Sequence, residues 1–136
     1  MKKIISLILI AAFVLTLALT LVSCDTIDSY KDRLEEADYE VEVSDDEDEI
    51  EAWAESADVD ADDIKSILVA ANEDFESVTI IECKSSSAAN DLYDSLEDDI
   101  KDIEEAYELI GKTFVAEVKG SFFIFGDEAA VEDAIG

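Results

Sequence analysis

The stretch VTIIECKSSSAANDLYDSLEDDIKDIEEAYELIG, residues 78–111, joins a strand to a long helix and sets the expected fold class. Residues 78–83 are mostly β-branched and apolar, which predicts a strand. The three serines at 85–87 are N-cap candidates for the helix. Apolar residues then recur at steps of three and four, as expected for one helix face: Ala89, Leu92, Leu96, Ile100, Ile103, Tyr107 and Ile110.

This helix is longer than the strand that it would cover. A helix from residue 87 to residue 110 would be about 36 Å long, against about 20 Å for a six-residue strand. We therefore expect it to overhang the sheet, bend, or break near Glu97-Asp98-Asp99, and to end at Gly111.

The residues before this stretch predict further elements. A helical spacing starts at Ile27, and residues 39–43 alternate as in a half-buried strand. Ser44 and Glu47 match a capping box for the helix that carries Trp53. Residues 64–71 are ambiguous; we favour a strand joined to the next by a hairpin around residues 72–76, and the alternative is a helix from residue 60 to residue 71.

The residues after this stretch predict a hairpin and a short helix. Residues 114–118 alternate, and Lys119-Gly120 offers a tight turn. Residues 122–125 are apolar on both faces, which indicates a central strand. Asp127 is a cap candidate for the last helix.

The order of these elements predicts an α+β fold, in one domain covering residues 30–136. We expect an antiparallel sheet of four to five strands with helices packed on one face. The arrangement is similar in outline to a ferredoxin-like split βαβ unit with an extra strand and helix at its end.

The first residues have the order of a secretory signal. Lys2 and Lys3 precede an apolar run, Ile4–Val22, that is 19 residues long. That length is also close to the roughly 20 residues needed to span a bilayer, so an uncleaved membrane span is the alternative. In both cases the lysines stay inside and the acidic part lies outside.

The end of this run, Leu21-Val22-Ser23-Cys24, resembles the lipobox of bacterial lipoproteins. The resemblance implies transfer of a diacylglycerol group to the Cys24 thiol and cleavage after Ser23 by the lipoprotein signal peptidase. Residues 1–23 would then be the signal peptide and residues 24–29 a lipidated tether. Two or three acyl chains anchor a protein stably where one is marginal, which implies a place on the outer face of the cell membrane.

The remainder of the chain is similar to small acidic lipoproteins of uncharacterised function. The segments that carry this resemblance are Ala37-Asp38-Tyr39-Glu40-Val41, Ala89 to Leu96, and Val118 to Gly126. Asp38 stands where the pattern has a glycine. The resemblance implies no catalytic residues.

Charge restricts the class of partner. Without residues 1–23, seven basic residues face 37 acidic ones, a net charge of −30. Such a surface repels nucleic acid and anionic lipid headgroups. It favours a cationic or protein partner, divalent ions, or a saline habitat in which ions screen the repulsion.

The residue types exclude much catalytic chemistry. The chain has no histidine, so the Ser-His-Asp triad and His-ligated metal sites are absent. If Cys24 is lipidated, Cys83 is the one remaining thiol, and its apolar neighbours indicate a buried hydrophobic residue. Trp53 and Phe122 to Phe125 are interpreted as core. We expect no enzymatic activity and no cofactor.

One acidic loop resembles half of a calcium site. Asp58, Asp60, Asp62 and Asp63 have the alternation of a calcium loop, but the central glycine is missing and Val69 stands where the bidentate glutamate belongs. They are weak metal candidates, and a solvated loop is the simpler interpretation. The leading hypothesis is a membrane-anchored binding module, with a divalent-cation-binding or salt-adapted surface protein as the alternative.

Overall fold

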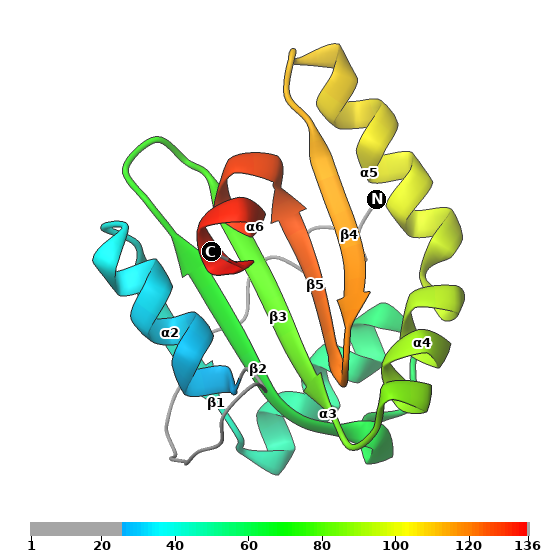
Figure 1. Cartoon of the computed structure of the whole chain (residues 1–136). Coiled ribbons are helices and arrows are strands. Elements are labelled where there is room, and N and C mark those ends of the chain that lie inside the picture. The colour runs from blue at the N-terminus through cyan, green and yellow to red at the C-terminus, as the bar shows by residue number, and fades with distance from the viewer. Residues whose placement is uncertain (1–25, 136) are drawn as a thin grey trace.

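The computed structural model describes residues 26–135, which form an open five-stranded antiparallel sheet covered by helices (Figure 1). The residues predicted to form the lipobox, 21–24, lie outside this range. The α+β class and the antiparallel sheet are confirmed. The elements are α2 (Ile27–Glu36), β1 (Glu40–Ser44), α3 (Glu47–Ala57), the 3₁₀ helix η1 (Ala61–Asp63), β2 (Ile64–Ala71), β3 (Ser77–Cys83), α4 (Ser86–Ser95), α5 (Glu97–Leu109), β4 (Phe114–Lys119), β5 (Phe122–Asp127) and α6 (Glu128–Ile135).

The strands lie in the order β1-β2-β3-β5-β4, and each neighbouring pair is antiparallel. The hairpin predicted around residues 72–76 is confirmed, so residues 64–71 are a strand and the helical alternative holds only for η1. The Asn72 side chain closes this hairpin, because its Oδ1 accepts from the backbone N–H groups of Asp74 and Glu76, both at 3.0 Å.

Helices cover both faces of the sheet, so the prediction that they pack on one face is wrong. One core contains side chains from α3, α4 and α5, and the other contains side chains from α2 and α6. Alternate residues of β5 enter alternate cores: Phe123 and Phe125 face the first, Phe122 and Ile124 the second. Every residue of β5 is buried. A strand that is apolar on both faces needs cover on both.

The ferredoxin-like outline applies to one half of the sheet. β3 and β4 run parallel with β5 between them, and α4 and α5 connect them, which is a split βαβ unit. The first half differs, because β1 and β2 are antiparallel neighbours although α3 lies between them in the chain. The position of β5 confirms the central strand predicted from residues 122–125.

α2 begins at Ile27, where the predicted helical spacing starts, and so includes residues 27–29 of the predicted tether. The Thr26 hydroxyl caps it by accepting from the Ser29 N–H at 3.2 Å. The capping box at Ser44 does not form. Ser44 ends β1 and is buried, and Asp46 caps α3 instead, its Oδ1 accepting from the Asp48 N–H at 2.9 Å.

The long helical pattern breaks at Leu96. A break near Glu97-Asp98-Asp99 was one of the three expected outcomes. Leu96 is buried and separates α4 from α5, with backbone angles of −103° and 5°. Ser85 caps α4, since its hydroxyl accepts from the Ala88 N–H at 3.0 Å. The predicted apolar stripe is buried as far as Ile103, but Ile110 lies past the end of α5 and is 68% exposed.

Three helices end in the same way, with a residue in the left-handed conformation. After α2, Asp38 has a φ of 70°, and the Tyr39 N–H reaches back to the Leu34 carbonyl at 3.0 Å. Asp58 after α3 and Gly111 after α5 have φ values of 61° and 75°. This is the Schellman arrangement, in which glycine is preferred because a Cβ is strained there.

We predict that Asp38→Gly stabilises the domain by about 0.5–1 kcal/mol, because it removes a strained Cβ at a left-handed position. Asp38→Asn is the control, since it removes the same negative charge from the helix C-terminus but keeps the Cβ. The free energy of unfolding in urea measures both. Equal gains from the two variants would show that charge, and not backbone conformation, is responsible.

Candidate functional site

Three of the four weak metal candidates, Asp58, Asp60 and Asp63, have different local roles. Asp58 is the left-handed residue that ends α3, where the Val59 N–H bonds to the Ala54 carbonyl at 2.9 Å. The Asp60 carboxylate caps η1 by accepting from the Asp62 N–H at 2.9 Å. The Asp63 backbone carbonyl accepts from the Lys84 N–H at 2.9 Å, which attaches the loop to the end of β3.

Local structure accounts for two of these aspartates. Helix capping favours the short carboxylate of Asp60, and a left-handed turn tolerates Asp58. Within residues 26–135, no group of three or more cysteine or acidic side chains lies close enough together to hold a metal ion.

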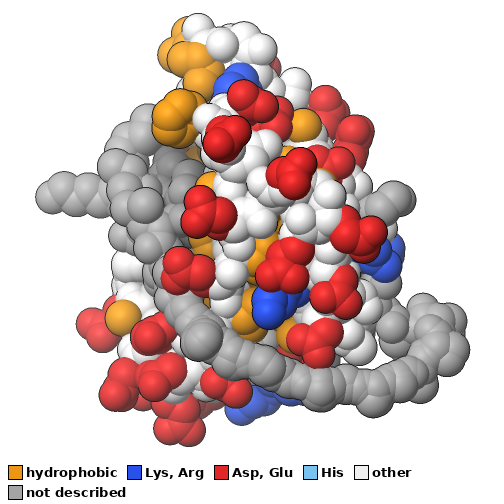
Figure 2. All heavy atoms as spheres, turned by 90° about the vertical axis from the view of Figure 1, so that its left-hand side faces the viewer, with side chains coloured by type: hydrophobic (Ala, Val, Ile, Leu, Met, Phe, Trp, Pro, Cys, Tyr) orange, Lys and Arg blue, Asp and Glu red, His pale blue; other side chains and the backbone are white. Residues whose placement is uncertain are grey.

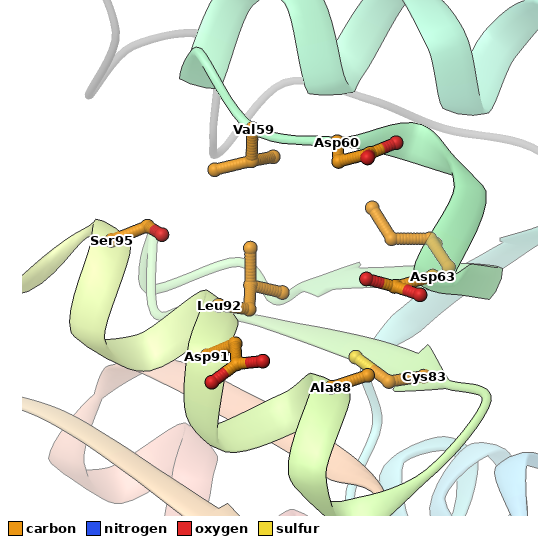
Figure 3. A pocket seen from close by; sticks show the side chains of 9 residues that line it. Val59, Asp60, Asp63, Cys83, Ala88, Asp91, Leu92 and Ser95 are labelled. Atoms are coloured by element: carbon orange, nitrogen blue, oxygen red, sulfur yellow. The ribbon is translucent and has the colours of Figure 1, made fainter.

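Asp60 and Asp63 do line a small hollow between this loop and α4 (Figure 3). The floor of the hollow is apolar and contains the buried side chains of Ile64, Cys83, Ala88 and Leu92. Asp60 and Asp63 lie on its rim, and Asp91 of α4 lines it from the opposite wall. Its volume is about 70 Å³. Pockets for small-molecule ligands measure roughly 300–1,000 Å³, so the hollow fits only water or a very small group.

Cys83 is a neutral thiol at the floor of this hollow. It is 2% exposed, and burial raises its pKa to about 12, with a further contribution from the negative charges of Asp63 and Glu82. A reactive cysteine needs a lowered pKa and access to solvent, and Cys83 has neither. The prediction that it is a buried hydrophobic residue agrees with this environment.

The residues predicted to be core are core. Trp53 is fully buried on α3, and Phe122 to Phe125 lie in the two clusters described above. Phe123 contacts Tyr93 of α4 edge to face, with ring centroids 5.9 Å apart. These aromatic side chains therefore pack the two cores of the domain.

A larger groove lies on the opposite side of the sheet, between α6 and β4. Its volume is about 450 Å³, within the range of ligand pockets. Three apolar and three acidic side chains line it: Val115, Val131, Ile135, Glu117, Glu128 and Glu132. The sequence did not predict this groove, because local patterns do not show that α6 packs on the sheet beside β4.

The surface of the domain carries many acidic side chains. Figure 2 shows them spread over the face that lies on the left of Figure 1, with hydrophobic side chains at the top of this view and in gaps between the acids. Within the described residues, no helix is both long and apolar enough to cross a membrane. The proposed lipidation residue Cys24 and its recognition residues Leu21, Val22 and Ser23 lie outside the described range, so those assignments stay predictions.

We predict that the Cys83 thiol reacts with an aromatic disulfide reagent at pH 8 far more slowly in the folded protein than in 6 M guanidinium.

The same thiol should make stability depend on pH. In the folded protein the pKa of Cys83 is about 12, above the ordinary value of 9, so the unfolded chain loses the thiol proton at lower pH and stability falls as pH rises above 9. Between pH 9 and pH 10 the thiol accounts for about 1 kcal/mol of that loss. Cys83→Ala should remove this part of the pH dependence, and an unchanged slope would contradict the assignment.

We also predict that salt stabilises the domain without ion specificity. Going from 0.01 M to 1 M NaCl shortens the Debye length from about 30 Å to about 3 Å, which screens the repulsion among the carboxylates. The thermal midpoint should rise by about 5 °C or more, as expected for a gain of roughly 1 kcal/mol. CaCl₂ at equal ionic strength should give the same midpoint. A further rise at millimolar calcium would instead show a specific divalent site.

No family model matches this chain, and neither the curated proteins nor the solved structures that were compared with it gave a match.

Proposed function

We propose that the protein is a lipid-anchored interaction module on the outer face of the cell membrane, held there through Cys24 and binding a cationic partner with its acidic domain. The observation that carries the proposal is the position of the lipobox-like segment Leu21–Cys24, which comes directly before a folded domain. The domain supplies the interaction surface, and the segment supplies the attachment.

The spacing between the two parts supports attachment close to the membrane. α2 begins at Ile27 with Thr26 as its cap, so only Asp25 separates Cys24 from the domain. Two peptide units span at most about 7 Å. A lipid on Cys24 would therefore hold the domain against the membrane surface.

The charge of the domain supports a lipid as the means of attachment. With 37 acidic residues against seven basic ones after Ser23, the domain is repelled by anionic headgroups. Two or three acyl chains supply the binding energy that the protein surface lacks. The same charge favours a basic partner and steers its approach.

The chemistry of the hollow and the groove described above supports binding over catalysis. The buried Cys83 is protonated, and the hollow around it is too small for a substrate. The 450 Å³ groove contains carboxylates and aliphatic side chains, which suit recognition of a cationic group with an apolar stem.

We predict that Cys24→Ala abolishes incorporation of labelled fatty acid, whereas Cys83→Ala leaves it unchanged. These are the two cysteines of the chain, so each variant is the matched control for the other. The measurement is fatty-acid labelling in growing cells, followed by separation of membrane and soluble fractions.

Two results would contradict the proposal. Equal labelling of the wild-type protein and Cys24→Ala would place the lipid elsewhere. An unlabelled wild-type protein that stays in the membrane and retains Met1 would instead support the uncleaved membrane span.

A further inference from the structure

We propose that the groove between α6 and β4 binds an extended basic segment of a partner protein, which lies along the free edge of β4. Apolar side chains of that segment would pack on the floor of the groove, and its lysine or arginine side chains would pair with the three glutamates. This inference rests on the proposed interaction function and specifies its site and the chemistry of its partner.

The groove exists because the helical layer on this side is narrower than the sheet. α6 is eight residues long and packs on β5 and β3, whereas β4 is the last strand of the sheet. Val115 and Glu117 of β4 face the α6 side, where Val115 is half-buried and Glu117 is exposed. On the other side of the sheet, alternate residues of β4 pack against the core that α4 and α5 cover.

The floor of the groove is apolar. Val131 of α6 is 2% exposed, and Val115 and Ile135 beside it are half-buried. Val115 and Ile135 are partly exposed and pack against the buried core on that side, to which Val131 belongs. Covering such surface is favourable for an aliphatic side chain or for the methylene stem of a lysine.

The rim of the groove is negative. Glu128 and Glu132 are exposed and lie one helical turn apart on α6, and Glu117 faces them from β4. Like charges at this helical spacing repel each other. Three lysines of the domain form ion pairs, and none of these pairs involves a glutamate of the groove: Lys31 with Glu35, Lys65 with Glu82, and Lys112 with Asp127. A cationic ligand would relieve this repulsion, and an anionic one would increase it.

The edge of β4 favours an extended ligand. Among the described residues β4 pairs only with β5, so alternate N–H and C=O groups on its outer side are available to a further strand. A segment added there places every second side chain on the α6 side, where the groove lies. A second copy of this chain is disfavoured, since its net charge has the same sign.

The test measures binding of the fluorescent peptide Lys-Ser-Val-Ser-Lys-Ser-Val-Ser-Lys to the full-length protein in detergent. In an extended conformation this peptide presents lysine and valine on one face. Glu128→Gln/Glu132→Gln should weaken binding about fivefold, as expected for the loss of two partly exposed ion pairs. The matched control is Glu104→Gln/Glu108→Gln on α5, an exposed pair with the same spacing and charge, which should change the affinity less than twofold.

Equal weakening by the two double variants would overturn the inference, because it would show general attraction to an acidic surface. The same conclusion would follow if a peptide with serine in place of both valines bound equally well. Hydrogen exchange then locates the peptide. Residues 114–119 of β4 should gain protection, while residues 40–44 of the opposite edge strand β1 should not, and any other pattern contradicts the site. Failure of the fatty-acid labelling would refute the membrane anchor and leave this binding result unaffected.

Discussion

A strand that is apolar on both faces has to be covered on both, and β3 and β5 impose this requirement on the whole domain. Adjacent isoleucines of β3, Ile80 and Ile81, enter opposite cores, as the side chains of β5 do. The chain meets the requirement with α3, α4 and α5 on one side and with α2 and α6 on the other (Figure 1). Because α6 is short, the second layer leaves part of β4 uncovered, and the groove is the consequence.

The chain places its many acids where helices and turns tolerate them. Glutamates and aspartates occupy the first turns of α3 and α5, where the positive end of the helix dipole favours them. Asp127 differs from these acids, because it is buried at the end of β5. Its Oδ2 accepts from the Ser77 N–H at 2.8 Å and its Oδ1 lies 3.7 Å from Lys112 Nζ, so the carboxylate has partners on two sides.

Local patterns in the sequence predicted most elements of the fold. Residues 64–71 form the favoured strand, and the helical alternative fails because β1 and β3 pair with this segment on both sides, which no local signal reveals. The errors arose where a local pattern did not decide the tertiary arrangement. Ser44 had the spacing of a helix cap, but its place in β1 opposite Ile67 took precedence, and Asp46 became the cap. The spacing of apolar residues identified α2 as amphipathic, but it carries no information about which face of the sheet α2 covers. The groove was not predictable either, because Val115 of β4 and Ile135 of α6 become neighbours only when β5 runs back beside β4 and α6 folds onto the sheet.

The membrane assignment depends on a different kind of information, since four adjacent residues, Leu21 to Cys24, carry it independently of the fold. The most direct test is mass spectrometry of the N-terminal peptide of the protein isolated from its native membranes. If Cys24 is lipidated, we expect a peptide that begins at Cys24 and carries the mass of a diacylglyceryl group on its sulfur. An intact Met1 together with an unmodified Cys24 would contradict the lipid anchor.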